Sequence, residues 1–143
     1  MIIVFDLDGT LSLVGNRIKY LQKEPKDWDS FYNACDEDKS NYPIFRVCSG
    51  LLASGYNIKV VTGRRESVRE KSLKWLNEYG LMIRSKDLIM RKSGDFRSDV
   101  IIKPELIKPF ADKIEILFDD RDGVVDMWRK MGYTCLQVAP GKF

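Results

Sequence analysis

The chain has 143 residues, with 44% hydrophobic and 31% charged side chains and a formal net charge of +3, a composition typical of one globular domain. Its apolar stretches are only a few residues long and no basic, apolar leader opens the sequence, so we expect neither a membrane span nor a signal peptide. The sequence contains no histidine, which excludes histidine-based catalysis and HExxH zinc sites and leaves carboxylates, lysine and tyrosine for acid–base chemistry.

Cysteine and charge distribution limit the class of protein further. Cys35, Cys48 and Cys135 are odd in number and widely separated, which argues against a disulfide framework or a cysteine zinc site and predicts a reducing, cytoplasmic environment. Positive charge is concentrated in residues 61–108, which carry 12 basic and 7 acidic side chains. Such an excess is typical either of a solvated helix face or of a surface that meets a polyanion.

Short β-rich runs alternate along the chain with segments that have apolar residues at helical spacing. The predicted strands are Ile2–Phe5, Ile58–Thr62, Leu88–Met90, Ile114–Phe118 and Cys135–Val138. The predicted helices are Ile44–Ser54, Glu66–Tyr79, Pro104–Asp112 and Gly123–Met131. Strands that are apolar throughout indicate a parallel sheet covered on both faces, so we expect a single α/β domain over residues 1–143 with a three-layer, doubly wound, Rossmann-like sheet.

Residues 13–41 interrupt the alternation directly after the first predicted strand. The segment is polar and rich in aromatic residues, and loops of this length inside compact domains are usually functional or disordered. We expect a small, cap-like and partly helical insertion over the ligand-binding edge of the sheet. Its Trp28, Phe31 and Tyr32 either stack on a nucleobase or pack the insertion onto the main domain. Trp75 and Trp128 lie at helical spacing and are expected in the core.

Three predicted strands end in polar residues. Asp6 and Asp8 follow the first strand, Thr62 ends the second, and Asp119 and Asp120 follow the fourth. Because parallel strands all end at one edge of a sheet, four carboxylates meet there, and such crowding is unfavourable unless a cation is present. Mg²⁺, which prefers carboxylate and water oxygens, is the cation we expect.

The spacing of Asp6 and Asp8 indicates a particular reaction. Residues i and i+2 of a strand project to the same side, so both carboxylates can reach one substrate atom. One carboxylate can attack phosphorus and form an aspartyl-phosphate, while its neighbour protonates the leaving oxygen and later deprotonates a water. A calcium EF-hand loop does not fit, because Leu11 and Arg17 stand where it needs Gly and Glu, and the residues after Gly55 are not those of a P-loop.

These residues resemble the four motifs of the haloacid-dehalogenase (HAD) phosphatase superfamily, namely Asp6-Leu7-Asp8-Gly9-Thr10, Thr62-Gly63-Arg64, a later lysine, and Asp119-Asp120. Within that superfamily, nearly the whole chain is similar to the 3′-phosphatase domain of the bacteriophage polynucleotide kinase-phosphatases. The segments that carry this resemblance are Gly15-Asn16-Arg17, Gly63-Arg64, Gly94-Asp95-Phe96-Arg97-Ser98-Asp99 and the final FDDRDGVVDMWRKMGYTCLQVAPGKF. Because these 143 residues contain no P-loop, we expect them to correspond to the phosphatase half of that family without the kinase half.

The resemblance implies a role for each catalytic residue. Asp6 would be the nucleophile and Asp8 the general acid and base. Thr62 would hydrogen-bond the transferring phosphoryl group, and Lys103 would neutralise the phosphate and orient the nucleophile. Lys92 is a weaker candidate for the lysine that contacts phosphate.

The resemblance also implies a metal site and a set of substrate contacts. Mg²⁺ would be held by Asp119 and Asp120, together with Asp6 and the carbonyl oxygen of Asp8. The residues that match the family's substrate-binding positions are Arg17, Gly63, Arg64, Arg97 and Asp99. The arginines suit phosphate because their planar guanidinium groups bind its oxygens in pairs. A helical i,i+4 ion pair between Asp99 and Lys103 is an additional or alternative role for those two residues.

The function that the resemblance implies is a Mg²⁺-dependent phosphomonoesterase. Its substrate would be the 3′-phosphate of a nucleic-acid end or of a nucleoside 3′-monophosphate, and a separate kinase or ligase would be its partner, with no membrane involved. The location would be cytoplasmic, in a host cell if a phage encodes the chain. Two alternatives are a HAD phosphatase for free nucleoside 5′-monophosphates or other small metabolites, and a non-catalytic nucleic-acid-binding module. The second alternative predicts the loss of a catalytic or metal-binding carboxylate, and each of these carboxylates is present.

Overall fold

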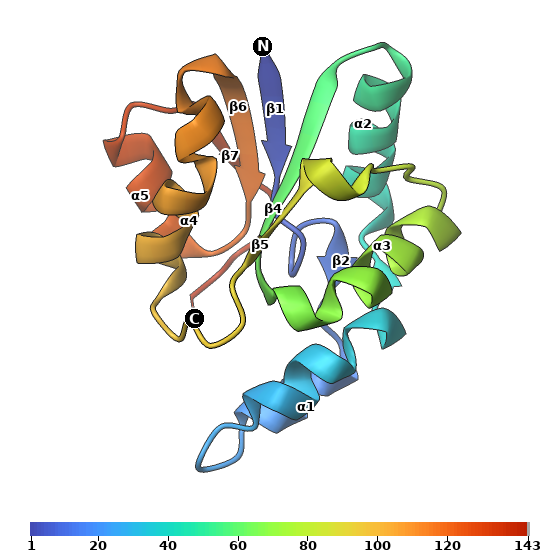
Figure 1. Ribbon diagram of the computed structural model, residues 1–143, viewed down its shortest axis with the longest axis vertical. Coiled ribbons are helices and arrows are strands. Elements are labelled where there is room, and N and C mark those ends of the chain that lie inside the picture. The colour runs from blue at the N-terminus through green and yellow to red at the C-terminus, as the bar shows by residue number, and fades with distance from the viewer. Residues whose placement is uncertain (143) are drawn as a thin grey trace.

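A five-stranded parallel sheet forms the centre of the protein in the computed structural model, which describes residues 1–142 and leaves Phe143 outside the described residues (Figure 1). The strand order is β5-β4-β1-β6-β7, and each neighbouring pair is parallel. The strands are β1 (Ile2–Phe5), β4 (Asn57–Arg65), β5 (Leu88–Arg91), β6 (Ile114–Asp119) and β7 (Cys135–Gln137). The order confirms the predicted α/β class with a parallel, Rossmann-like sheet.

The central strand β1 packs against both hydrophobic cores because its side chains alternate between the two faces of the sheet. Ile3 and Phe5 belong to one cluster of buried apolar residues, and Ile2 and Val4 belong to the other. All four side chains are buried, which explains why the strand is apolar throughout. This burial on both faces fixes β1 in the sheet and so fixes the direction in which Asp6 leaves it.

Helices cover both faces of the sheet. The helices α2 (Tyr42–Ala53) and α3 (Arg69–Glu78) pack on one face, and α4 (Asp99–Ile107) and α5 (Asp122–Lys130) pack on the other (Figure 1). Trp75 and Trp128 are each 1% exposed, one in each core, as their spacing predicts.

Several predicted boundaries were wrong. The helix expected from Pro104 begins five residues earlier, because the side chain of Ser98 accepts a hydrogen bond from the backbone N–H of Val100 and caps α4. The α-helix ends at Ile107 and continues as the 3₁₀ segment η5 (Lys108–Lys113). The strand expected to end at Thr62 continues to Arg65, with an irregular register against β5.

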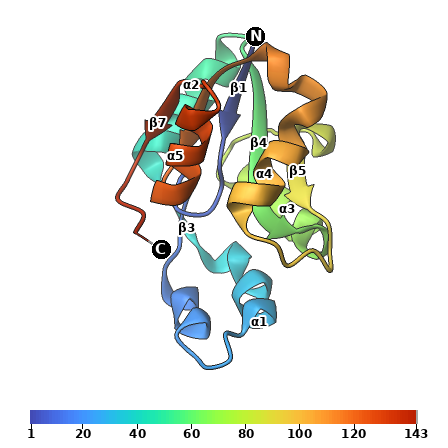
Figure 2. The ribbon, with the colours of Figure 1, turned by 90° about the vertical axis from the view of Figure 1, so that its left-hand side faces the viewer.

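The insertion of residues 13–41 lies beyond the carboxyl end of β1, as Figures 1 and 2 both show. Its two ends pair as short antiparallel strands, β2 (Ser12–Leu13) and β3 (Lys39–Ser40). The segment between them is largely helical, as predicted, and consists of η1 (Asn16–Leu21), α1 (Trp28–Asn33) and η2 (Cys35–Glu37). Among the helices described for residues 1–142, none is long and apolar enough to span a bilayer.

Candidate active site

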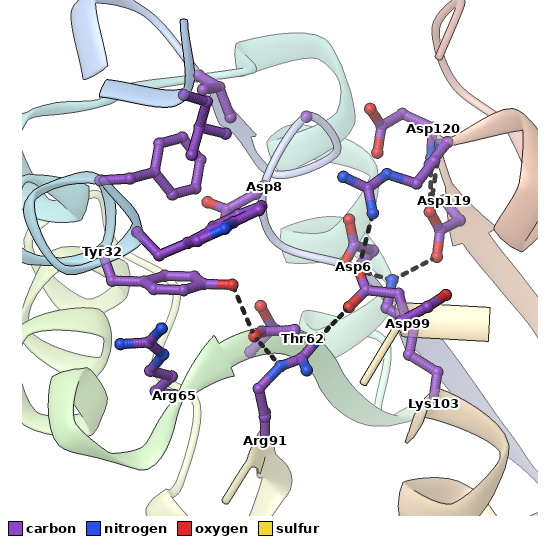
Figure 3. A pocket seen from close by; sticks show the side chains of 18 of the residues that line it. Asp6, Asp8, Tyr32, Thr62, Arg65, Arg91, Asp99, Lys103, Asp119 and Asp120 are labelled. Carbon is purple, nitrogen blue, oxygen red and sulfur yellow. Dashed lines mark hydrogen bonds and ion pairs between the residues drawn. The ribbon is translucent and has the colours of Figure 1, made fainter. Parts of the chain in front are cut away.

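The carboxyl ends of β1, β4 and β6 meet at one rim of the sheet, as the sequence predicts. A pocket of about 510 Å³ opens there, within the size range of small-molecule sites. Asp6, Thr62 and Asp119 line it, each from a different strand end (Figure 3). The insertion forms a further part of the wall.

Asp6, Asp119 and Asp120 form a compact group of buried carboxylates. One oxygen of each lies within 4.8 Å of the others. The ammonium group of Lys103, which is 2% exposed, donates hydrogen bonds to Asp6 Oδ1 at 2.9 Å and to Asp119 Oδ2 at 2.8 Å. Three negative charges and one positive charge are therefore buried together, and the group carries a net charge of about minus two when every carboxylate is ionised.

The excess negative charge of this group favours binding of a divalent cation. Burial raises the pKa of Asp6 well above its usual value, and the neighbouring carboxylates add to the rise while Lys103 opposes it. Burial, followed by the charge of Asp119, raises the pKa of Asp120 to about 6. Carboxylate oxygens are the ligands that Mg²⁺ prefers, and a divalent ion would balance the excess charge, so these residues fit a magnesium site.

Close backbone approach at Gly9 shapes the same group. Gly9 has a φ of 89°, which an L side chain adopts only with strain, and an added Cβ would lie 2.2 Å from Asp120 Oδ2. The hydroxyl of Thr10 lies 3.5 Å from carboxylate oxygens of both Asp6 and Asp120. Glycine at this turn therefore lets the segment after β1 pack directly against the end of β6.

Asp8 lies in a different environment, although it is only two residues from Asp6. Its carboxylate forms ion pairs with Arg17 from the insertion and with Arg64 from β4, the latter at 2.6 Å. Both arginines are buried, and Arg17 also binds Asp38 with two hydrogen bonds of 2.8 and 2.7 Å. Arg64 donates a further hydrogen bond to the hydroxyl of Ser72. Two buried arginines and two aspartates therefore balance one another in charge.

This pairing determines the ionisation state of Asp8. Burial alone would raise its pKa, but the charges of Arg64 and Arg17 and their hydrogen bonds outweigh burial and hold the pKa below its usual value. Asp8 is thus a carboxylate at neutral pH and ready to accept a proton. Environments that push the pKa values of two neighbouring carboxylates apart are a frequent sign of separate chemical roles.

The end of β4 forms another side of the pocket. Thr62 is fully buried, and its hydroxyl oxygen accepts a hydrogen bond from the backbone N–H of Arg64 at 3.1 Å. The carbonyl oxygen of Gly63 accepts hydrogen bonds from the Tyr32 hydroxyl and from Arg91 Nε. An added Cβ at Gly63 would lie 2.6 Å from a carboxylate oxygen of Asp99, so glycine permits this close contact.

The structure brings most of the residues predicted for the site into the pocket wall. The predicted residues that line it are Asp6, Asp8, Thr62, Gly63, Arg97, Asp99, Lys103, Asp119 and Asp120. Arg17 and Arg64 lie against Asp8 and are not among the described residues that line the pocket, so in this structure they hold Asp8 rather than face the cavity.

The sequence left alternative roles open for Lys92, Lys103 and Asp99. Lys92 is exposed, whereas Lys103 is buried and forms an ion pair with Asp6, so Lys103 is the lysine that lies at the carboxylate group. Asp99 forms an ion pair with Arg91 at 2.5 Å and a longer one with Arg121 at 3.5 Å. The i,i+4 arrangement of Asp99 and Lys103 is thus present in α4, but the ion pairs of both residues are formed with other elements.

Sequence reasoning missed Arg91 and Asp38. Arg91 is the last residue of β5, and it binds Gly63, Asp99 and the backbone of the loop at residues 95–97. The rule that polar residues at parallel strand ends converge would have identified it. Asp38 has no such signal, because only the folded insertion brings it to Arg17, 21 residues earlier in the chain.

The insertion's aromatic residues mainly pack it onto the main domain. Phe31 and Tyr32 are 6% and 9% exposed and belong to the hydrophobic core. Trp28 is partly buried against this core and lies 5.9 Å, centroid to centroid, from the stacked ring of Tyr32. The packing interpretation is therefore confirmed for Phe31 and Tyr32, although edges of all three rings also reach the pocket.

Solved structures similar to this chain include two that match nearly its whole length. Two structures of the Pnkp1/Rnl/Hen1 complex, one of them described as an RNA repair complex, match 99% of the chain with 36% and 34% identity and TM-scores of 0.80 and 0.84. The chain covers only 46% and 43% of those two proteins, so it spans just under half their length. A class C acid phosphatase from Bacillus anthracis has the same fold, with 17% identity, a TM-score of 0.64, and coverage of 98% of this chain and 66% of that one.

The family assignment rests on the whole sequence. The family model described as the polynucleotide kinase PNKP phosphatase domain matches residues 1–143. The carboxylates, Thr62 and Lys103 described above lie within that match and meet at one pocket. The chain is therefore a phosphatase of the HAD type that belongs to the family of polynucleotide kinase PNKP phosphatase domains.

Proposed function

We propose that the protein removes 3′-phosphates from nucleic-acid ends or nucleoside 3′-monophosphates by a Mg²⁺-dependent reaction with an aspartyl-phosphate intermediate. The observation that supports this most strongly is the pair of chemically distinct aspartates at one pocket. Asp6 lies with the unbalanced carboxylates, and Asp8 lies between two arginines. A nucleophile and a proton carrier need such different environments.

Asp6, Asp119 and Asp120 would hold the magnesium ion, with Asp8 contributing its backbone carbonyl because its carboxylate is paired with arginines. The bound ion would offset the negative charge of a phosphate beside these carboxylates. Residues of the chain would carry out the nucleophilic attack and the proton transfers.

The first step is attack by a carboxylate oxygen of Asp6 on the phosphorus atom, which forms an Asp6–phosphate bond and breaks the bond to the leaving oxygen. Lys103 uses two of its three N–H donors on Asp6 and Asp119, so the third remains for a phosphoryl oxygen. The Thr62 oxygen accepts from Arg64, and its own O–H therefore remains to donate to the phosphoryl group.

Asp8 carries the proton in both steps. A phosphate bound beside it adds negative charge, which raises the pKa of Asp8 and allows it to carry the proton that the leaving alkoxide takes up. The resulting carboxylate, held by Arg17 and Arg64, then accepts a proton from the water that attacks phosphorus and breaks its bond to Asp6 in the aspartyl-phosphate. Inorganic phosphate and the free 3′-hydroxyl leave, and Asp6 is regenerated.

The choice of a 3′-phosphate rests on the family and on the relatives at 34–36% identity over nearly the whole chain. Those relatives come from assemblies named for three components, Pnkp1, Rnl and Hen1. We propose that a kinase or a ligase acts as a partner and supplies the neighbouring steps of end repair.

Comparison of three substrates tests this function. We expect release of phosphate, dependent on Mg²⁺, from a 3′-phosphorylated oligonucleotide and from a nucleoside 3′-monophosphate, with a much lower kcat/KM for the nucleoside 5′-monophosphate. A preference for the 5′-monophosphate would instead support a phosphatase of free nucleotides.

A further inference from the structure

The pocket has two sides of different chemistry. Asp119 and Asp120 lie on the side where phosphate would react, and Tyr32 and Arg65 lie across from them (Figure 3). Next to Tyr32, the insertion supplies a wall made of apolar side chains. We call it the apolar wall, and its members are Leu13, Val14, Ile18, Leu21 and Trp28.

Two residues of the apolar wall are exposed although their side chains are hydrophobic, and the other three are partly buried. Leu13 is 47% exposed and Ile18 is 44% exposed, and both line the pocket. Across from the insertion, the loop after β5 adds Phe96, which is 78% exposed and also lines the pocket. Exposed apolar surface gathered in a pocket marks a place where a ligand replaces water.

Polar groups next to the wall already have partners. The Tyr32 hydroxyl donates to Gly63 O, and burial raises the pKa of this phenol to about 12, so it stays neutral. The Arg65 guanidinium lies 5.1 Å from the ring of Tyr32 and 5.2 Å from that of Phe96, and it forms an ion pair with Asp29. A sugar or a small polar metabolite would lose hydrogen bonds to water here, whereas a flat aromatic ring would bury its faces.

We propose that the apolar wall receives the nucleobase of the nucleotide whose phosphate reacts at Asp6. The inference rests on the proposed function and adds to it how the substrate is selected. The base is held by apolar and stacking contacts, which accept any base because every base has an aromatic face. The enzyme therefore requires a base at the terminal nucleotide without discriminating among the four bases.

Two oligonucleotides that differ only in their last residue test the inference. One ends in a 3′-phosphorylated thymidine, and the other ends in a 3′-phosphorylated abasic residue. Since stacking of one base on protein contributes about 1–3 kcal/mol, we expect kcat/KM to be roughly 5- to 100-fold higher for the first, with most of the difference in KM. The four bases should give values within about threefold of one another, since stacking contacts tolerate any base.

Variants of exposed apolar residues test whether the preference for the base-bearing end depends on the apolar wall. We expect Ile18→Asn to reduce the ratio between the two substrates by about half or more, because it removes one exposed apolar contact of the wall. Met82→Ser, a change of an apolar residue that is 68% exposed and does not line the pocket, should preserve the ratio. Thermal unfolding of both variants verifies that they are folded.

The outcomes separate this inference from the proposed function. Equal use of the base-bearing and the abasic ends would overturn the inference and leave the 3′-phosphatase function standing. A ratio unchanged in Ile18→Asn would also overturn it, because the base would then bind elsewhere. Release of phosphate from neither oligonucleotide, with hydrolysis of other phosphate esters, would overturn the proposed function and the inference together.

Discussion

Asp6 and Asp8 are two residues apart in sequence, yet the structure surrounds them with opposite electrostatics. Around Asp6, three buried carboxylates share one lysine. Around Asp8, two buried arginines meet two aspartates, one of which comes from the insertion. The group around Asp8, which we call the Asp8 side, is therefore balanced in charge. The group around Asp6, the Asp6 side, carries excess negative charge that a bound cation would balance. In the proposed reaction, this difference would separate the nucleophile Asp6 from the proton carrier Asp8 while both line one pocket.

The largest effect is expected from removing the nucleophile. We expect Asp6→Asn to lower kcat by about 10⁴-fold or more, because the amide has nearly the same shape but cannot form the aspartyl-phosphate. Phosphate release under saturating Mg²⁺ measures this change. The variant should unfold at or above the wild-type temperature, since it removes one charge from a crowded group. Activity within about tenfold of wild type would contradict the role assigned to Asp6.

Metal removal tests the unbalanced charge of the Asp6 side. Chelation should abolish turnover, and Mg²⁺ should restore it. Folding raises the pKa of Asp6 and Asp120, so the metal-free folded protein binds more protons than the unfolded chain between about pH 4 and pH 6. These groups therefore destabilise the metal-free protein progressively as the pH rises through that window.

Calorimetry measures how much bound Mg²⁺ raises the Tm at each pH. Because bound Mg²⁺ competes with protons for the same carboxylates, its stabilisation of the fold should be larger at pH 7 than at pH 5. An increase in Tm that is the same at both pH values would count against these carboxylates as the metal site.

The Asp8 side should respond most strongly to the loss of a buried arginine. We expect Arg64→Gln to lower the free energy of unfolding by about 3 kcal/mol, because the fully buried guanidinium group is lost and Asp8, whose side chain is only 20% exposed, loses a partner. The neighbouring change Arg65→Gln is the control, since it removes an ion pair whose aspartate is 82% exposed and should cost about 1 kcal/mol or less. Denaturant titrations of both variants give the comparison, and equal losses would contradict it.

The ion pairs of Asp8 also make the stability of the protein depend on pH. Folding lowers the pKa of Asp8, so this group stabilises the protein above the pKa of the unfolded chain, near pH 4. The stabilisation is lost as the pH falls through the lower pKa of the folded state. This is the opposite of the trend expected for Asp6 and Asp120.

The smallest effects concern two glycines. Gly9→Ala would place a methyl group 2.2 Å from Asp120 at a positive φ, and we expect a loss of about 1–3 kcal/mol together with weaker Mg²⁺ binding. Gly50→Ala is the matched control, because this glycine lies in α2 with open space around it. There we expect a gain of about 0.5–1 kcal/mol from helix propensity. If Gly9→Ala behaves like Gly50→Ala, the close packing at Asp120 is not required.

The site could be predicted from the sequence wherever it depends on strand ends. Asp6, Thr62 and Asp119 follow apolar runs that are buried on both faces, and parallel strands necessarily end at one edge. We could therefore predict that these three residues lie close together without knowing any distance between them. The start of α4 was missed because Pro104 was read as the first turn, whereas the capping side chain is Ser98.

The Asp8 side could not be predicted in the same way. Arg17 and Arg64 are suited to phosphate by their chemistry, and nothing local in the sequence shows that Asp8 and Asp38 already occupy their donors. That pairing depends on how the insertion packs, with the indole N–H of Trp75 donating to the carbonyl oxygen of Asp38. Long-range contacts of this kind need the folded structure.

Trapping the covalent intermediate tests the division of roles between the two aspartates most directly. In Asp8→Asn, an aryl phosphate should still phosphorylate Asp6, because its leaving group needs no proton, while hydrolysis of the phosphoenzyme slows for lack of a base. Rapid quenching and mass spectrometry of the peptide around residues 1–17 should then find one phosphoryl group on Asp6. Absence of a phosphorylated peptide while Asp8→Asn still turns over, or a phosphoryl group on another residue, would contradict the account.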